Sequence, residues 1–177
     1  FMRECLYHPD YGYYSRASAD RFGDYYTSVD VHPIFGRLLA RQLAEMWEIL
    51  GSPRPFLAVE AAAGTGRLAG HILDFAARAL PAFYAALEYV AVERSAARRA
   101  EHAARLASHS AAGRVSTAVG IPAIIPAGCI FSNELLDALP THRVVMENGA
   151  LREACVEING ERFVEALCEP STPLLAQ

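Results

Sequence analysis

Two groups of side chains in this sequence have types and spacings that could support chemistry. The first is a turn of small residues with a carboxylate, in which Glu60, Ala62, Gly64 and Gly66 occupy alternate positions. Small residues let a ligand approach unpaired backbone N–H groups, which are concentrated where a helix begins. A carboxylate there would repel a pyrophosphate, whereas it can accept hydrogen bonds from amino or hydroxyl groups. The turn therefore predicts a site for a nucleoside with a cationic tail, a description that S-adenosylmethionine fits better than NAD.

The second group follows the apolar run Gly128–Ser132 and contains two carboxylates, Glu134 and Asp137. Residues three apart share one face of a helical turn, so these carboxylates could hold a guanidinium group together. They could also accept its proton during methyl transfer, which makes them the candidate catalytic residues. Alternatively, Asn133 and Asp137 are helix caps, and the local sequence leaves both interpretations open. His142 is a further candidate base, although a single histidine at the start of a strand is more often structural.

The elements that must position these groups alternate in type along the chain. The apolar run Pro55–Glu60 predicts a buried strand, and Leu68–Leu80 predicts a helix after the turn. Further strands are expected at Glu88–Glu93, Arg114–Val119 and Gly128–Ser132, and a further helix at Ala96–Leu106. This alternation predicts an α/β fold of the Rossmann-like kind, with a mostly parallel sheet flanked by helices. Ligands bind such sheets at the carboxyl ends of the strands, where Glu93 could accept both hydroxyls of a ribose.

The two ends of the chain have a different character. Residues 1–28 are rich in aromatic and turn-forming residues and predict an ordered loop, and Pro33–Leu50 predicts a helix. After Pro140, three strands are expected at His142–Glu147, Ala150–Ile158 and Arg162–Leu167, joined at Asn148-Gly149 and Asn159-Gly160 into an antiparallel meander. We therefore expect effectively one domain, made of an N-terminal segment (1–53), a cofactor-binding core (54–140) and the meander (141–177).

Composition excludes several classes of protein. The chain has 177 residues, of which 53% are hydrophobic and 20% charged, so it is globular rather than disordered. A net charge of −4 argues against a general nucleic-acid binder, and no apolar run reaches the ~18 residues of a membrane span. Four scattered cysteines (Cys5, Cys129, Cys155 and Cys168) form no zinc-binding pattern, so we expect no metal site and a reducing compartment. Cys129 lies in an apolar strand pattern and is expected in the core.

A dinucleotide site is the main alternative for the turn. Gly64 to Ala69 matches the pattern G-x-G-x-x-G/A literally, which by itself is weak evidence for NAD(P) and an oxidoreductase. However, Gly64 comes four residues after Glu60 instead of directly at the end of the strand. Glu93 also lies 27 residues beyond Gly66, further than the usual ~20 residues. A tight turn that binds no ligand is the third interpretation.

Five blocks of sequence occur in a characteristic order. The blocks are Gly23–Ser28, Pro33–Gly36, Val59–Gly66, Val92–Ser95 and Asn133–Pro140. With these blocks, the chain resembles the MidA-type S-adenosylmethionine-dependent methyltransferases, relatives of the mitochondrial complex I assembly-factor arginine methyltransferase. The opening stretch Leu-Tyr-His-Pro-Asp-Tyr-Gly-Tyr-Tyr also fits this family.

The resemblance implies N-methylation of an arginine in a protein substrate, for example a subunit of a respiratory complex. It places the cofactor S-adenosylmethionine against Glu60, Ala62, Gly64, Gly66, Glu93 and Asn133, with the block that contains Thr27 and Ser28 closing over it. Glu134 and Asp137 would line the acceptor side. The resemblance also implies a location in the bacterial cytoplasm, or in the mitochondrial matrix of a eukaryote. Because Ala62 replaces a family glycine and the chain is shorter than the family, a non-catalytic assembly factor is the alternative.

Overall fold

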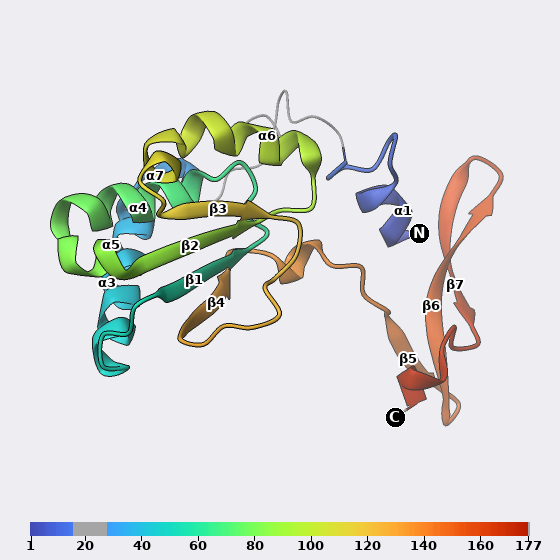
Figure 1. The fold of residues 1–177 in the computed structure, drawn as a ribbon. Helices are drawn as coiled ribbons and strands as arrows, with labels where there is room; N and C mark the ends of the chain where they lie inside the picture. The colour runs from blue at the N-terminus through green and yellow to red at the C-terminus, as the bar shows by residue number, and fades with distance from the viewer. Residues whose placement is uncertain (16–27, 177) are drawn as a thin grey trace. The chain divides into compact units, whose positions relative to one another are not determined.

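The computed structural model of the protein describes residues 1–15 and 28–176, apart from the side chains of Ser28 and Asp30. Internal contacts divide the chain into two compact units (Figure 1). The larger unit comprises residues 17–135, and the smaller one combines residues 1–16 with 136–177. The three-segment division expected from the sequence is a different partition of the chain, and it stays a prediction.

The larger unit is built on a four-stranded parallel sheet, which confirms the predicted α/β fold. Its strand order is β3-β2-β1-β4. Ala61 is in register with both Val92 and Ser132, so β1, β2 and β4 end at the same level. The residues that follow these strands therefore share one edge of the sheet. The strands are β1 (Phe56–Ala61), β2 (Leu87–Val92), β3 (Val115–Ala118) and β4 (Gly128–Ser132).

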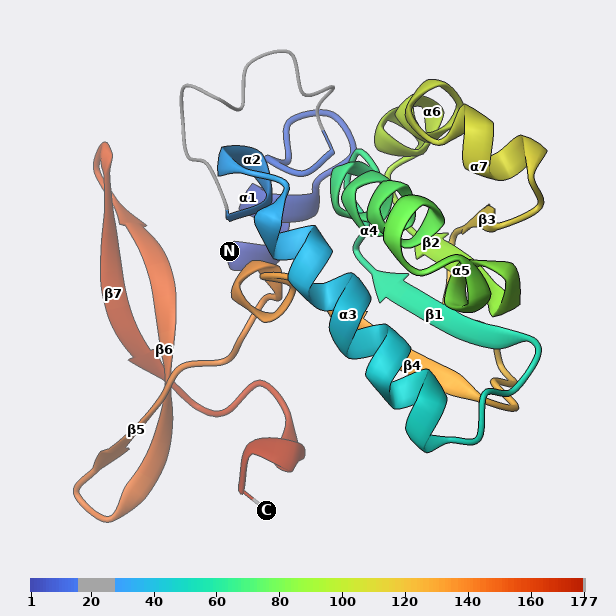
Figure 2. The ribbon, with the colours of Figure 1, turned by 90° about the vertical axis from the view of Figure 1, so that its left-hand side faces the viewer.

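The two faces of this sheet bury side chains of alternating strand positions. On one face, Phe56 and Ala58 belong to the main apolar cluster, which includes residues of α3 and α4. On the other face, Val59 joins a smaller cluster with Val90 and Val92. Figure 2 shows α3 and α4 side by side along the sheet. The helices of this unit are α2 (Ser28–Val31), α3 (Ile34–Ile49), α4 (Arg67–Ala79), α5 (Pro81–Ala86), α6 (Ala96–Arg105) and α7 (Ala107–Ala111).

Most predicted elements occur within a residue or two of their expected bounds, but some short helices were not anticipated. Helix α5 begins with Pro81 at its first position, where a proline has no hydrogen bond to lose. Six residues are too few to show a helical period, which explains why this helix escapes a sequence pattern. Residues 2–7 likewise form α1 (Met2–Tyr7), so the expectation of a loop was wrong there.

The smaller unit contains an antiparallel sheet of order β5-β6-β7, as the meander predicted. Asn148 and Gly149 both have positive φ, at 51° and 80°, which is the conformation of a two-residue type I′ hairpin turn. The second turn differs by one residue from the prediction, because Asn159 pairs with Arg162. The strands are β5 (Val144–Glu147), β6 (Ala150–Asn159) and β7 (Arg162–Cys168), and short 3-10 turns occur at Leu136–Ala138 and Pro173–Ala176.

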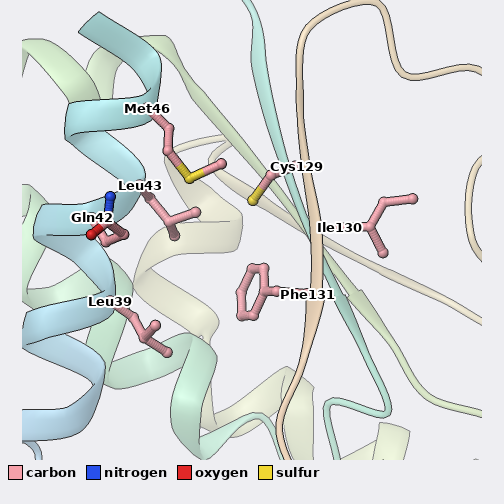
Figure 3. A pocket seen from close by; sticks show the side chains of 7 residues that line it. All are labelled: Leu39, Gln42, Leu43, Met46, Cys129, Ile130 and Phe131. Atoms are coloured by element: carbon pink, nitrogen blue, oxygen red, sulfur yellow. The ribbon is translucent and has the colours of Figure 1, made fainter. Parts of the chain in front are cut away.

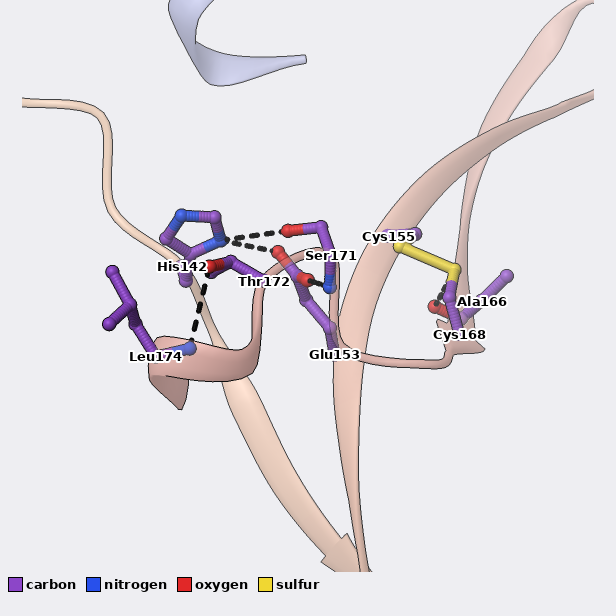
Figure 4. A network of polar contacts seen from close by, with 8 residues as sticks. All are labelled: His142, Glu153, Cys155, Ala166, Cys168, Ser171, Thr172 and Leu174. Carbon is purple, nitrogen blue, oxygen red and sulfur yellow. Dashed lines mark hydrogen bonds and ion pairs between the residues drawn. A yellow bond between two sulfur atoms is a disulfide. The ribbon is translucent and has the colours of Figure 1, made fainter. Parts of the chain in front are cut away.

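The register of β6 and β7 brings two of the four cysteines together. Cys155 lies opposite Ala166 and diagonally beside Cys168, and the two cysteines form a disulfide with a Cα–Cα distance of 6.2 Å (Figure 4). The spacing of the cysteines in the sequence gave no sign of this pairing, and a disulfide is unusual in the reducing compartment that the sequence analysis expected. Cys129, in contrast, is half-buried against the main apolar cluster, which confirms its predicted place.

Candidate cofactor site

The turn after β1 has the backbone conformation that its small residues predict. Ala62, Gly64 and Gly66 have φ angles of 61°, 56° and 78°. This left-handed region is open to glycine and costs other residues about 1–2 kcal/mol. Ala62 thus adopts a backbone conformation that is typical of glycine, the residue that the resemblance leads us to expect at this place.

Backbone hydrogen bonds hold the turn against the end of β2. The N–H of Ala63 donates to the carbonyl oxygen of Val92 at 2.9 Å. The N–H of Gly64 donates to Oε2 of Glu93, also at 2.9 Å. Within the turn, the N–H of Gly66 donates to the carbonyl oxygen of Ala63 at 2.9 Å. The turn is therefore ordered by the protein's own contacts.

Glu93 is buried at the end of β2 and joins the turn to the start of α6. Its Oε1 accepts a hydrogen bond from the N–H of Ser95 at 2.8 Å, while Oε2 is bound to Gly64. A carboxylate offers about four acceptor positions, so about two remain for the hydroxyls of a ribose. The structure thus adds a structural role to the cofactor role predicted for Glu93.

Helix α6 contributes two contacts that the sequence analysis did not anticipate. His102 Nε2 lies 2.8 Å from the carbonyl oxygen of Gly64, and Arg105 Nε donates to the carbonyl oxygen of Thr65 at 3.0 Å. Both residues lie in the C-terminal half of α6, a helix that was predicted. Their only sequence signal was the presence of polar residues three apart on that helix.

Glu60 lies in the interior near the end of β1, and the whole residue is only 3% exposed. Its Oε2 accepts a hydrogen bond of 2.6 Å from the hydroxyl of Tyr89. Burial raises the pKa of Glu60 to about 7, against the lowering effect of the Tyr89 hydrogen bond, and the nearby charge of Glu93 raises it further. Contact between Glu60 and the cationic tail of a cofactor stays a prediction.

The start of α4 completes a binding surface of the expected kind. Gly66 is the N-cap of this 13-residue helix, and no side chain caps it. Uncapped N–H groups attract the lone pairs and negative groups of a ligand. A β-carbon built on Gly64 would have no atom within 4 Å, so a ligand can approach the backbone closely there. Together with the carboxylate of Glu93, these features fit the nucleoside cofactor that the sequence predicted.

The second predicted group is only partly assembled. Asn133 follows β4 directly and so lies at the same edge of the sheet as the turn. Glu134 has a φ of 53°, outside the range of a right-handed helix, and the helical turn begins only at Leu136. The expectation that Glu134 and Asp137 share a helical face was therefore wrong. Glu134 is part of the larger unit, and Asp137 is part of the smaller one.

Two further candidates of the cofactor site cannot be placed. Thr27 lies outside the described residues, and Ser28 begins α2 without a described side chain. Their role over the cofactor stays a prediction. Among the described residues, no group of histidine, cysteine and acidic side chains could hold a metal ion. In the same part of the chain, we find no helix with the length and apolar character needed to cross a membrane.

An apolar hollow of about 180 Å³ lies between α3 and β4 (Figure 3). None of the predicted site residues lines it, so it is separate from the cofactor turn. Its lining is almost wholly apolar and offers no charged group to a polar ligand. The lining residues are Leu39, Gln42, Leu43, Met46, Cys129, Ile130 and Phe131.

His142, the further candidate base, is held in a structural network of the smaller unit (Figure 4). Its Nδ1 lies 2.6 Å from Oε1 of Glu153, whose Oε2 accepts from the N–H of Ser171 at 2.7 Å. The Ser171 hydroxyl also faces Nδ1, at 3.5 Å. A relay needs the acid and the hydroxyl on opposite ring nitrogens, and here both face the same one. The contact with Glu153 gives His142 a structural role, while its role as a base for the acceptor stays a prediction.

The Glu153 contacts predict a pH dependence for the smaller unit. The hydrogen bonds from His142 and Ser171 lower the pKa of Glu153 from 4.5 to about 2. A lowered carboxyl pKa means stabilisation that is complete above pH 4.5 and lost as the pH falls towards 2. We expect Glu153→Gln to lower the melting temperature at pH 7 and to flatten its decline between pH 5 and 2. Circular dichroism melts would test this, with the exposed Glu157→Gln on the same strand as control.

Comparison with known proteins identifies the family. The family model described as "Putative S-adenosyl-L-methionine-dependent methyltransferase" matches residues 38–177. The chain belongs to this family. Its cofactor is therefore S-adenosylmethionine, and the turn at Glu60–Gly66 lies within the matched region.

Individual relatives of this methyltransferase chain agree with the assignment. A Drosophila melanogaster protein, named the mitochondrial protein arginine methyltransferase NDUFAF7 homolog, is 29% identical over 176 residues, which covers 89% of this chain and 40% of the relative. The human mitochondrial protein arginine methyltransferase NDUFAF7 is 38% identical over 74 residues, covering 41% of this chain and 17% of that protein. The chain thus spans less than half the length of the curated relatives it matches.

Two solved structures show the same fold. A protein from Burkholderia thailandensis, described as a "COG1565 superfamily member and likely methyl transferase" bound to S-adenosyl-homocysteine, matches with a TM-score of 0.77 and 28% identity. The match covers 99% of this chain and 46% of that one. A native crystal structure from the same organism matches with a TM-score of 0.76 and 31% identity, over 99% of this chain and 44% of that chain.

Proposed function

We propose that this protein transfers the methyl group of S-adenosylmethionine to an arginine side chain of a protein substrate. The observation that carries the methyl-transfer part is the ordered turn between β1 and α4, which presents Gly64 beside the buried carboxylate of Glu93. The arginine part is supported by the names of the Drosophila and human relatives.

The chemistry divides between the cofactor and this chain. When bound, the cofactor supplies an activated methyl group on a sulfonium sulfur, and the carbon–sulfur bond breaks as the carbon–nitrogen bond forms. The turn and Glu93 hold the nucleoside, so the rate gain comes mainly from proximity and alignment. Either Glu134 or Asp137 would orient the acceptor and accept the proton that its nitrogen loses.

A protein partner and a location follow from the same proposal. An arginine acceptor implies a protein substrate, and a respiratory-complex subunit is a specific hypothesis that a pull-down would test. The two curated relatives are named as mitochondrial proteins. For this chain, the mitochondrial matrix of a eukaryote or the cytoplasm of a bacterium stays the predicted location.

Asp137→Ala separates binding from transfer. We expect it to leave the dissociation constant for S-adenosyl-homocysteine within about twofold of wild type and to lower methyl transfer by about 100-fold, the usual contribution of a positioned acid–base group. Calorimetry would measure binding, and incorporation of a labelled methyl group into an arginine-containing peptide would measure transfer. Glu45→Ala, which removes an exposed carboxylate from α3, is the control. Equal transfer by the Asp137 variant and wild type would exclude Asp137 as a catalytic residue.

A further inference from the structure

Both backbone polar groups of Gly64, which belong to two successive peptide bonds, are bound by the protein. Its N–H donates to Glu93, and its carbonyl oxygen lies 2.8 Å from Nε2 of His102. A carbonyl oxygen can only accept a hydrogen bond, so Nε2 of His102 carries the proton. The other ring nitrogen, Nδ1, lies 3.0 Å from the hydroxyl oxygen of Thr117. In a neutral ring with a protonated Nε2, Nδ1 is an acceptor and the Thr117 hydroxyl donates to it.

His102 is placed for this contact by its burial and by the glycines of the turn. The whole residue is only 2% exposed. A β-carbon built on Gly66 would lie 3.0 Å from Cδ2 of His102 and 3.3 Å from Cδ1 of Leu106. Arg105, on the same helix as His102, donates a hydrogen bond to the carbonyl oxygen of Thr65, the residue between Gly64 and Gly66. Helix α6 therefore contacts three consecutive residues of the turn.

We infer that His102 is a positioning residue for cofactor binding. Acting as an Nε2–H donor, it holds the carbonyl of Gly64, which keeps this residue where its N–H meets Glu93 and where the start of α4 follows it. Through Nδ1 it also ties the turn to Thr117 on β3, the far edge of the sheet. This inference rests on the assignment of the turn to S-adenosylmethionine, and it goes beyond it by naming a residue that need not touch the cofactor.

Variants of His102 separate hydrogen bonding from packing. His102→Gln keeps an N–H group at the position of Nε2, whereas His102→Phe keeps a flat ring without a donor. We expect His102→Phe to weaken binding of S-adenosyl-homocysteine by roughly tenfold or more, as loss of a buried hydrogen bond predicts, and His102→Gln to restore most of it. Thr117→Val removes only the hydrogen-bond partner of Nδ1, so its affinity for S-adenosyl-homocysteine should lie between those of His102→Phe and His102→Gln. Calorimetry would give the dissociation constants, with melting curves to show that each variant is folded.

A second measurement tests the same inference without ligand. In the free protein, amide hydrogen exchange at Gly64 and Gly66 should be slow in wild type and His102→Gln, and faster by about tenfold in His102→Phe. Long-range nitrogen–proton NMR spectra of wild type should show the proton on Nε2. Wild-type exchange rates and affinity in His102→Phe, or a proton on Nδ1 alone, would overturn the inference. Failure of wild type to bind S-adenosyl-homocysteine would instead contradict the proposed function, while the exchange rates would still decide the role of His102.

Discussion

Glu93→Ala is expected to weaken the binding of S-adenosyl-homocysteine by at least about 100-fold. The carboxylate accepts hydrogen bonds from the backbone N–H groups of Gly64 and Ser95, at 2.9 Å and 2.8 Å. Hydrogen bonds to a charged group contribute about 1.5–3 kcal/mol each, and 1.4 kcal/mol corresponds to a tenfold change in affinity. The substitution removes the anchor of the turn and the predicted acceptor for the ribose at once. Calorimetric titration with S-adenosyl-homocysteine would measure the loss.

Two further variants make the Glu93 experiment specific. Glu88→Ala removes an exposed carboxylate from the same strand, so it controls for the change of charge and should bind like wild type. Glu93→Gln keeps one acceptor oxygen and turns the other into a donor, so it satisfies only one of the two N–H groups. Its affinity should lie between those of wild type and Glu93→Ala. Binding by Glu93→Ala within threefold of wild type would contradict the assigned role of Glu93 in the cofactor site.

Gly66→Val should both destabilise the protein and abolish cofactor binding. The φ angle of 78° disfavours a β-branched residue, and a β-carbon there would approach His102 to 3.0 Å and Leu106 to 3.3 Å. Left-handed strain costs about 1–2 kcal/mol and overpacking about 1–3 kcal/mol, so the free energy of unfolding should fall by about 2–5 kcal/mol. Urea unfolding would measure stability, and calorimetry would measure binding of S-adenosyl-homocysteine.

Gly113→Val is the matched control for Gly66→Val. Gly113 also has a positive φ, of 67°, but the position of its β-carbon has no neighbour within 4 Å. The free energy of unfolding of Gly113→Val should therefore fall only by the cost of backbone strain, about 1–2 kcal/mol. Its affinity for S-adenosyl-homocysteine should stay that of wild type. If both variants lose the same stability and both bind normally, the close contact between the turn and α6 has no role in the site.

Sequence patterns located the larger sheet because each of its strands has a local signal. The run Gly128–Ser132 was predicted with the bounds that β4 has, and the helix beginning at Ala96 follows a serine that caps it. The signal for the hairpin at Asn148-Gly149 was also local, since both residues tolerate the positive φ that its turn requires. Where the pattern was short or irregular, as in α1 and α5, the prediction missed a helix.

The cofactor turn was predicted better than the pairing of Glu134 with Asp137, and the difference has a physical reason. In the turn at Glu60–Gly66, Gly64 and Gly66 adopt positive φ without steric cost, so a local pattern was enough to locate it, although Ala62 adopts positive φ against its intrinsic preference. The pairing of Glu134 with Asp137 assumed a continuous helical turn, and the positive φ of Glu134 interrupts it. The disulfide depends on the register between β6 and β7. The turn that joins them lies one residue later than predicted, and this shifts the β7 partner of every β6 residue by two positions.

The sequence by itself determined the class of fold and the cofactor turn, with Glu93 as its expected carboxylate partner. These are properties of short segments, in which spacing and backbone preference act between near neighbours. Only the tertiary structure decided what holds the turn in place. His102 lies 38 residues from Gly64 in sequence, and its contact exists because α6 packs beside the turn. Packing between distant segments, rather than any local pattern, brings His102 to the Gly64 carbonyl and completes the candidate cofactor site.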